Sequence, residues 1–360
     1  MIHGLRITNF RCHRQVELLG LSRINLLLGK NNSGKTAVLE ALAFLSLRAN
    51  PRDVMVRLNE LRGYGAGADQ DEIMESLFHN WDRTQEISIE ATDTAGEFRP
   101  KTKDTPGWRE LRIRAMLGAR RENGPGGVID GASLVGATQG LTFQYRSPAT
   151  SIGRTVTDLT QKASRQTIAD LEDTSAVVYI PAHTVPDAQT VAQRFSRLEI
   201  ARQHEPVVDA LRVIEPRLRR LTVVATRGGS VLYGDLGAKH LMPVPLMGDG
   251  MLRALSIALA LAGSQNGLVL VDEVENGLHH SALPGVWRMI AQTARRLNVQ
   301  LFAATHSDEC IRALHSAVSS LSYQEDLRLY RFDMIERGTR AVDYTSEELA
   351  AAIESEQEVR

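Results

Sequence analysis

Residues 29–36, which read GKNNSGKT, constrain this chain more than any other feature. The apolar run 24–28 leads directly into them, and the apolar residues 37–45 predict a helix after them. Gly29 and Gly34 let the backbone curl so that consecutive N–H groups point at phosphate oxygens. The N-terminus of the following helix adds partial positive charge. A strand, this loop and a helix in that order predict a phosphate-binding loop.

Two side chains of the loop suit a nucleoside triphosphate with its metal ion. Lys35 is placed to reach the β- and γ-phosphates, and the Thr36 hydroxyl is placed to hold Mg²⁺. We therefore expect ATP and Mg²⁺ as cofactors. The residues expected to contact the nucleotide are Gly29, Lys30, Asn31, Asn32, Ser33, Gly34, Lys35 and Thr36.

A second apolar run, residues 268–271, ends in the adjacent carboxylates Asp272 and Glu273. Asp272 is predicted to bind Mg²⁺, directly or through water. Glu273 is predicted to act as the general base for the attacking water. Neighbouring residues of an extended strand point to opposite faces, so the chain is expected to turn here.

A third apolar run, residues 301–304, leads through Thr305 to His306. A histidine at the end of a core strand can donate a hydrogen bond to a γ-phosphate. Because several polar groups are expected to converge on one site, we predict that His306 senses that phosphate.

Gly248, Asp249 and Gly250 precede a strongly apolar segment that is expected to be helical. Glycines at a helix N-terminus form an anion site, and one subunit has no need of a second such site. In a head-to-tail dimer this segment would bind the γ-phosphate held by the other subunit. The chain itself is therefore a predicted partner.

Together these motifs resemble the ABC-type ATPase heads of the branch that contains RecF, the zinc-hook repair ATPases, SMC proteins and the OLD-type (overcoming lysogenisation defect) ATPases. Residues 5–11, LRITNFR, are similar to the opening strand of that branch, and the resemblance implies that Arg11 lies near the nucleotide. Residues 275–279 resemble the D-loop, and His306 resembles the switch histidine. Gly248 stands where the signature serine is expected, so a hydroxyl contact is lost. The Q-loop glutamine remains open among Gln139, Gln144 and Gln161.

The resemblance implies an α/β fold, a P-loop NTPase of ABC type with an N-terminal antiparallel β portion and an inserted helical and irregular lobe. Residues 1–50 and 222–325 are expected to form the ATPase core, and 326–360 a hairpin and helix that Ser346 can cap. Residues 51–221 are expected to form an inserted β-subdomain with a helical arm. Alternating polarity within that insertion predicts antiparallel strands with one solvated face.

The net charge of −1 creates no overall field that would recruit nucleic acid. Local arginine clusters occur at residues 217–220, 295–296 and 328–331, and most such runs are solvated faces. The two cysteines, Cys12 and Cys310, form no metal-ligand pattern and favour a reduced, cytoplasmic compartment. The apolar stretch 252–262 is too short to span a bilayer, so no membrane role is expected.

OLD-type nucleases carry a Toprim metal domain that needs a D-x-D motif, and residues 307–360 contain none. We therefore expect a stand-alone ATPase whose nuclease or toxin effector is a separate protein. The leading hypothesis is a dimerising ATPase that controls a partner acting on DNA or RNA, in DNA repair or phage defence. One alternative is a nucleotide-gated scaffold or sensor with slow hydrolysis, which Gly248 favours. An ABC transporter subunit is the other alternative, and the opening, signature and D-loop motifs argue against it.

Overall fold

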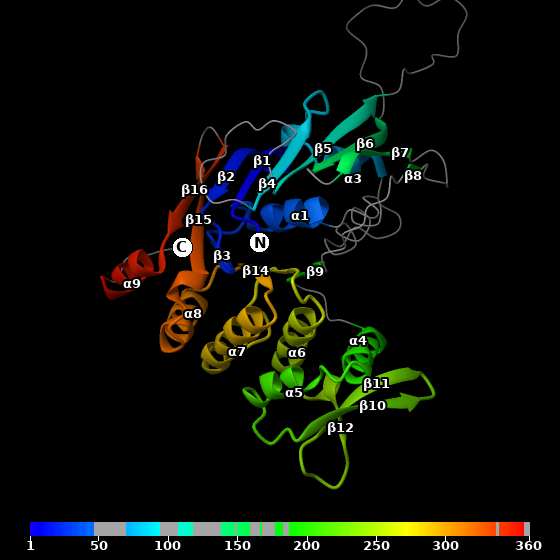
Figure 1. The fold of residues 1–360 in the computed structure, drawn as a ribbon, viewed down its shortest axis with the longest axis vertical. Coiled ribbons are helices and arrows are strands. Elements are labelled where there is room, and N and C mark those ends of the chain that lie inside the picture. The colour runs from blue at the N-terminus through cyan, green and yellow to red at the C-terminus, as the bar shows by residue number, and fades with distance from the viewer. Residues whose placement is uncertain are drawn as a thin grey trace, which may run out of the picture.

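The computed structural model describes residues 1–46, 70–93, 107–117, 138–147, 150–158, 166–167, 177–182, 187–335 and 338–355. In these ranges the chain forms a six-stranded sheet, a seven-stranded sheet and a small three-stranded sheet (Figure 1). Helices lie between and below the two large sheets, which gives the predicted α/β architecture.

The six-stranded sheet has the order β16-β15-β3-β14-β13-β9. Its strands are β3 (Ile24–Leu28), β9 (Val177–Ile180), β13 (Leu268–Val271), β14 (Gln300–Ala304), β15 (Leu327–Ile335) and β16 (Gly338–Tyr344). All except β16 run parallel. Parallel strands end at the same edge of a sheet, and ligands bind beyond that edge. The neighbours β3, β14 and β13 therefore bring the phosphate loop, the histidine and the carboxylates together.

The seven-stranded sheet is antiparallel and has the order β2-β1-β4-β5-β6-β7-β8. Its strands are β1 (Gly4–Phe10), β2 (His13–Leu19), β4 (Ile87–Thr92), β5 (Trp108–Leu117), β6 (Thr138–Ser147), β7 (Thr150–Asp158) and β8 (Gln166–Thr167). This sheet is the antiparallel β portion that the sequence predicted. Its strand β4 pairs with β1, so a strand from the expected insertion shares a sheet with the N-terminal strands.

Helix α1 (Lys35–Ser46) lies between the two large sheets (Figure 1). Successive residues of β3 point to opposite faces, so Leu27 packs with α1 and the antiparallel sheet while Leu26 and Leu28 join the other core. Because sheets cover α1 on two sides, ten of its twelve residues are buried. An apolar helix with no polar face is what this position requires.

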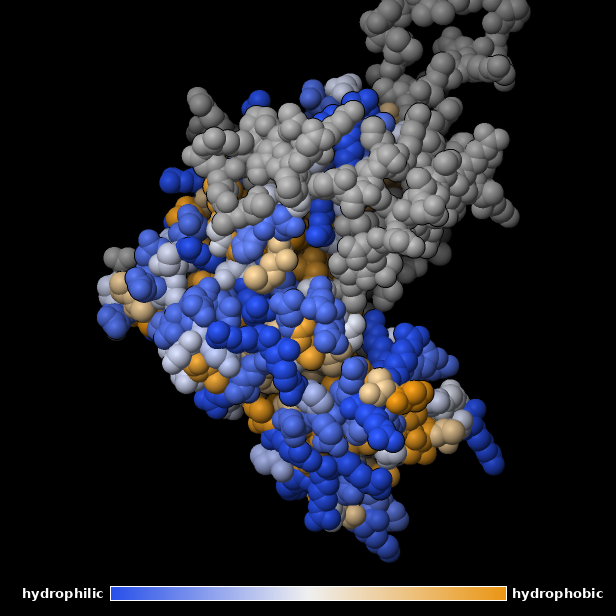
Figure 2. Space-filling model, viewed as in Figure 1, coloured by the Kyte–Doolittle hydropathy of each residue, from blue (hydrophilic) through white to orange (hydrophobic). Residues whose placement is uncertain are grey.

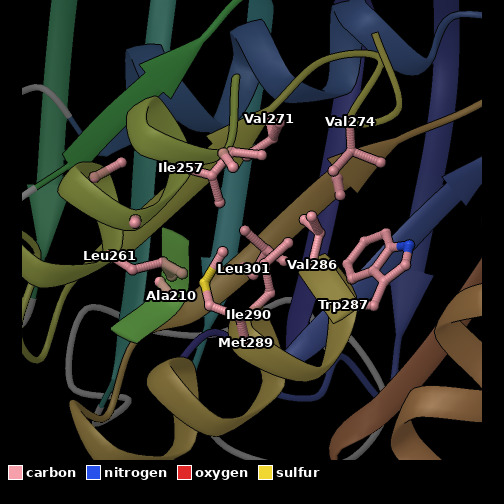
Figure 3. Close-up of a cluster of buried hydrophobic side chains, with 14 of the residues drawn as sticks. Ala210, Ile257, Leu261, Val271, Val274, Val286, Trp287, Met289, Ile290 and Leu301 are labelled. Atoms are coloured by element: carbon pink, nitrogen blue, oxygen red, sulfur yellow. The ribbon is translucent and has the colours of Figure 1, made fainter. Parts of the chain in front are cut away.

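The other face of the six-stranded sheet packs against α6 (Asp249–Ala262), α7 (Leu283–Arg296) and α8 (Asp308–Ser320). Figure 3 shows part of this core, where Trp287 and Ile290 of α7 lie near Leu301 of β14. All three of these side chains are completely buried. This second core fixes α6, and with it the signature segment (residues 248–253, which resemble the family signature), relative to the motif strands.

The helical arm expected within residues 51–221 corresponds to α4 (Ala188–Ile200) and α5 (Glu205–Arg212), which a strand follows. Strands β10 (Arg220–Thr226), β11 (Gly229–Asp235) and β12 (Met242–Pro243) form the small sheet. It lies beside α4 at the opposite end of the molecule from β5 and β6 (Figure 1). Figure 2 shows hydrophobic residues gathering here on a face that is otherwise mostly hydrophilic.

The division into core and insertion remains a proposal. The insertion supplies β9, the edge strand beside β13, as well as β4. Helix α9 (Ser346–Glu354) follows the C-terminal hairpin, and its cap is Thr345, which forms a capping box with Glu348. The expected cap Ser346 was therefore wrong by one residue. The remaining short helices are α3 (Gln70–Glu75), η1 (His79–Trp81), η2 (Val244–Leu246), η3 (His280–Ala282) and η4 (Gln324–Asp326).

Candidate nucleotide-binding site

The three motif strands hold one another at the edge where the site forms. The Thr305 N–H donates to the Leu27 carbonyl at 3.0 Å, and the Val274 N–H donates to the Ala304 carbonyl at 3.1 Å. These bonds continue the ladder beyond the strand ends. The loops that follow β3, β13 and β14 therefore begin from fixed positions.

The phosphate loop has the backbone shape that anion binding requires. Gly29 and Gly34 have φ values of 140° and 98°, a region that residues with a Cβ rarely adopt. Ser33 is buried, and its Oγ has no hydrogen-bond partner among the described residues. A buried hydroxyl without a partner is unfavourable, and a phosphate oxygen would supply one. The loop therefore fits a nucleotide phosphate.

The Lys35 ammonium lies inside the loop. It donates to the Gly29 carbonyl at 2.6 Å and to the Lys30 carbonyl at 2.9 Å. Burial lowers the pKa of Lys35, and the charges of Asp272 and Glu273 act in the opposite direction. The cation is thus held where the sequence placed it, among backbone carbonyls that a phosphate can replace.

Thr36, in the first turn of α1, and Asp272, directly after β13, meet directly. The Thr36 hydroxyl donates to Asp272 Oδ2 at 2.8 Å. Burial raises the pKa of Asp272, and the hydrogen bond from Thr36 partly offsets that effect. A hydroxyl and a carboxylate oxygen this close are suitable ligands for Mg²⁺, so these two residues would hold the ion.

The chain turns at Asp272 and Glu273, where the sequence predicts a turn. Strand β13 ends at Val271, and Glu273 has a φ of 45°, in the left-handed region. The Glu273 carboxylate accepts a hydrogen bond from Asn276 Nδ2 at 2.6 Å. The predicted turn is confirmed, and it separates the environment of Glu273 from that of Asp272. A strained backbone at this position is typical of a functional site.

His306 lies next to two carboxylates. Its Nδ1 is 3.8 Å from Glu273 Oε1 and 3.6 Å from Glu275 Oε1. Glu275 also accepts a 2.6 Å hydrogen bond from the Thr305 hydroxyl and a bond from the His306 N–H. Glu275 therefore ties the end of β14 to the loop after β13. Sequence analysis gave Glu275 only as part of the D-loop and missed this role.

Arg253 is a second residue whose role the sequence analysis missed. Its guanidinium donates to the backbone carbonyls of Asp272 and Glu273, the latter at 2.9 Å, and to that of Pro181 at 2.8 Å. Burial lowers the pKa of Arg253, and the Asp272 charge opposes that change. An arginine remains a cation in proteins, so it offsets the negative charge of the buried acidic groups. Its place in the signature segment was the available signal.

The last residue of β9 and the two residues after it supply three backbone acceptors to the same region. The Ile180 carbonyl accepts from the Asp272 N–H at 2.8 Å, the Pro181 carbonyl accepts from Arg253, and the Ala182 carbonyl accepts from Asn276 at 3.0 Å. The residue types in this segment do not indicate that it supplies hydrogen-bond acceptors, because the acceptors are backbone carbonyls. Only the pairing of β9 with β13 places them.

The N-terminus of α6 packs against the D-loop. A Cβ at Gly250 would lie 3.0 Å from the Gly277 carbonyl oxygen, so the two backbones approach closely. Gly248 is the N-cap of α6, and a Cβ built on it would meet nothing within 4 Å. Gly248 and Asp249 are exposed. The start of α6 at Gly248 and Asp249 is therefore open to solvent.

Arg11 contacts the helix after the loop. Its Nε lies 3.1 Å from Glu40 Oε2, and its Nη1 donates to the Ser76 hydroxyl at 2.7 Å. The assignment of Arg11 to the nucleotide remains a prediction, as do the other site assignments. Of the Q-loop candidates, Gln144 lies on β6, Gln161 is outside the described residues, and the side chain of Gln139 is not among those described.

His13, which the sequence analysis did not select, lies directly beneath the phosphate loop. Its Nε2 is 3.0 Å from the Gly34 carbonyl oxygen, and its Nδ1 is 3.1 Å from Thr339 Oγ1. The pKa of His13 is lowered to about 4, mainly by burial; the hydrogen bond with Gly34 opposes this change, and the charge of His79 contributes to it. His13 is therefore neutral at physiological pH.

The lowered pKa of His13 predicts a loss of stability in mild acid. An unfolded histidine takes up a proton near pH 6.5, whereas the folded one stays neutral until about pH 4. The contribution of the buried, neutral His13 to the free energy of unfolding is thus complete above pH 6.5. It decreases as the pH falls toward 4. We expect the free energy of unfolding to fall by about 2 kcal/mol from this group between pH 7 and pH 5. Urea denaturation at pH 7 and at pH 5 measures the free energy of unfolding. The protein with His13→Phe should show a smaller loss, and an equal loss in both proteins would refute the assignment.

Two family models match the chain. A model described as an AAA domain, putative AbiEii toxin, Type IV TA system, matches residues 137–312. Another, described as an AAA ATPase domain, matches residues 1–102, including the phosphate loop. The chain is therefore an ATPase that is similar to AAA domains over these two regions. No described helix of this ATPase has the length and apolar character needed to span a membrane.

Relatives of this ATPase agree with the predicted RecF and SMC branch. It is 21% identical to an ATP/GTP phosphatase of Helicobacter pylori, across 99% of each chain. It is 35% identical to the DNA replication and repair protein RecF of Clostridioides difficile over 71 residues, 19% of each chain. A solved SMC head, bound to the C-winged helix domain of ScpA, superposes with a TM-score of 0.53 at 10% identity and covers 97% of this chain and 99% of that one. The last similarity confirms the fold.

Proposed function

We propose that this ATPase binds ATP with Mg²⁺, dimerises head to tail around the bound nucleotide, and uses hydrolysis to control a separate effector protein that acts on nucleic acid. The observation that carries the proposal is the junction of Thr36, Asp272, Glu273 and His306 at one sheet edge. The hydrogen bond from Thr36 to Asp272 joins residues 236 positions apart, and His306 Nδ1 lies 3.8 Å from Glu273 Oε1. Such convergence of a phosphate loop with acid and base groups supports phosphoryl transfer to water.

Each residue has one task in this scheme. Lys35 binds the β- and γ-phosphates, and its charge neutralises the negative charge that develops during cleavage. Thr36 and Asp272 would hold Mg²⁺, and the ion would supply positive charge that offsets the charge of the phosphates. Glu273 accepts a proton from the attacking water. His306 contacts the γ-phosphate, and its neighbour Glu275 keeps the end of β14 in position.

Dimerisation gives a use to the exposed N-terminus of α6. Its N–H groups form an anion site that faces solvent, and the γ-phosphate of a partner subunit is the anion we propose for it. Gly250 packs on Gly277 of the D-loop, and the D-loop also carries Glu275 and Asn276. A subunit that closes on this surface would therefore press on the loop that holds Glu273. This links closure of the dimer to hydrolysis.

The substitution Gly248→Asp tests the dimer. In a background with Glu273→Gln, which blocks turnover, we expect ATP and Mg²⁺ to convert monomer into dimer. The added carboxylate would repel the partner's γ-phosphate, so the dimer dissociation constant should rise at least about tenfold, equivalent to 1.4 kcal/mol. Light scattering after size-exclusion chromatography measures the mass.

Binding of ATP to the monomer is the control for this test. A side chain at Gly248 meets no neighbour, although its φ of 97° is strained for an aspartate. The monomer should therefore keep its affinity for ATP. Dimerisation that is unchanged by the carboxylate would place α6 outside the interface. A monomer at all ATP concentrations in the parent protein would exclude the head-to-tail dimer.

The proposal of a separate effector protein rests on two further observations. The family model over residues 137–312 names a putative toxin system, and the SMC head that shares this fold was solved with a bound ScpA domain. We propose that an effector nuclease or toxin binds the ATP-closed dimer, in phage defence or DNA repair. Capture from the native host with Glu273→Gln and ATP should recover it. A permease in its place would favour transport, and wild-type protein without ATP is the matched control.

The arginine clusters give little support to direct binding of DNA or RNA by the ATPase itself. Arg217 pairs with Glu215 at 2.8 Å, and Arg295 pairs with Glu325 at 3.2 Å. Such pairs reduce the local positive charge available to phosphates. We therefore assign nucleic-acid contact to the effector. Strongly salt-dependent DNA binding by the isolated ATPase would contradict that assignment.

A nucleotide-gated scaffold or sensor remains the second candidate, on one observation. Gly248 caps α6 without a side-chain hydrogen bond, so no hydroxyl is available for a γ-phosphate at the signature position. In that case the closed dimer would persist and the wild-type protein would hydrolyse ATP slowly. Turnover measured beside the dimer lifetime separates the two candidates.

A further inference from the structure

The phosphate loop packs against the C-terminal hairpin of β15 and β16, and no motif predicted this contact. At the first loop glycine, a Cβ would lie 2.7 Å from the Phe332 carbonyl oxygen of β15. At Gly34, the last glycine of the loop, a Cβ would lie 2.3 Å from Cε1 of His13. His13 in turn reaches Thr339 on β16. Both glycines of the loop therefore rest on atoms that the hairpin supplies or contacts.

The hydrogen bonds define the state of His13. The Gly34 carbonyl can only accept, so Nε2 carries the proton and donates to it at 3.0 Å. Nδ1 then has a lone pair, which accepts from the Thr339 hydroxyl at 3.1 Å. Sδ of Met334 is a weaker alternative acceptor for that hydroxyl at 3.6 Å. His13 and Thr339 are both buried, so water does not compete for either bond.

Fixing the Gly34 carbonyl also fixes the N–H of Lys35. The peptide unit between these two residues is planar and trans, so its C=O and N–H point in opposite directions. The Gly34 carbonyl also accepts from the Val38 N–H at 3.1 Å, and this bond together with the one from His13 directs the Lys35 N–H to the opposite side of the loop. That side is where consecutive N–H groups are expected to meet phosphate oxygens.

We propose that His13 is a positioning residue for ATP binding, which orients the peptide between Gly34 and Lys35 and links it through Thr339 to the C-terminal hairpin. The inference rests on the proposed function and adds a residue outside the ATP-binding motifs. A change in the hairpin is then transmitted to the affinity for ATP. The hydrolysis step itself uses other groups, so its rate with saturating ATP is largely independent of His13.

The substitution His13→Phe tests the positioning role, because it keeps a buried ring and removes the donor. We expect the dissociation constant for a fluorescent ATP analogue, and the KM for ATP, to rise about tenfold, as for loss of one buried hydrogen bond. The kcat should change less than twofold. His13→Gln retains an N–H close to the position of Nε2 and should restore the affinity to within about threefold.

A matched control comes from His3, whose Nδ1 lies 3.2 Å from the Leu21 carbonyl oxygen, away from the loop. His3→Phe should leave the ATP affinity unchanged. Thr339→Val removes only a hydroxyl, so it tests the link even if His13→Phe does not fold. Thr339→Val should weaken ATP binding about threefold. The protein with both His13→Phe and Thr339→Val should bind ATP as tightly as the protein with His13→Phe alone.

The outcomes separate this inference from the function on which it rests. If the wild-type protein does not bind ATP, the proposed function fails. If the wild-type protein binds ATP and His13→Phe binds it equally well, only the positioning role fails. Equal weakening by His13→Gln and His13→Phe would attribute the effect to ring packing and would also overturn the inference.

Discussion

Replacing Glu273 by glutamine is expected to lower the rate of ATP hydrolysis by at least about 100-fold, the range typical of general-base catalysis. Glutamine has nearly the same shape but cannot accept a proton from water at neutral pH. The hydrogen bond from Asn276 Nδ2 can persist, because the glutamine oxygen is also an acceptor. Binding of ATP should therefore remain close to wild type. Phosphate release under saturating ATP measures the effect.

Glu275 provides a matched control for this substitution. It lies two residues along the same loop, and Glu275→Gln makes the same chemical change. The oxygen that accepts from Thr305 is retained in glutamine, so we expect hydrolysis to fall less than tenfold. Unaltered hydrolysis with Glu273→Gln would exclude Glu273 as the base. A larger effect from Glu275 would transfer the role to that carboxylate.

Replacing Lys35 by methionine is expected to abolish most ATP binding, with an increase in the dissociation constant of at least about 100-fold. Methionine keeps the aliphatic stem but removes the cation. A charge-assisted hydrogen bond contributes about 1.5–3 kcal/mol, and Lys35 is placed to make such bonds with two phosphates. Hydrolysis should fall further, because the lost charge also stabilises the transition state. Calorimetric titration with ATP and Mg²⁺ measures the affinity.

Lys30 is the control for Lys35, because it belongs to the same loop but its side chain is exposed. Lys30→Met should change the affinity less than fivefold. If both substitutions had equal small effects, the loop would not bind phosphate in the proposed way. The thermal unfolding midpoint of each variant shows whether the fold is retained, since Lys35 also bonds two backbone carbonyls.

The sequence predicted that the motif residues lie together because its signals are local. A glycine-rich loop between a strand and a helix, and apolar runs ending in Asp272 and His306, each depend on a few neighbouring residues. Parallel strands share an edge, so the order of these motifs along the chain indicated that they would meet. The turn at Glu273 followed from the alternation of side chains in a strand. Local pattern and tertiary structure agree at all of these positions.

Tertiary structure decided what lies around those motifs. The bonds of Arg253 to the loop after β13, the carbonyls after β9, and the support of Gly34 by His13 all join segments far apart in the sequence. Their partners are mostly backbone carbonyls, which every residue has, so no residue pattern marks them. The sequence by itself therefore determined which chemistry the chain carries. The pairing of β9 with β13 and of the hairpin with β3 decided how that chemistry is held, because only long-range packing brings these backbones together.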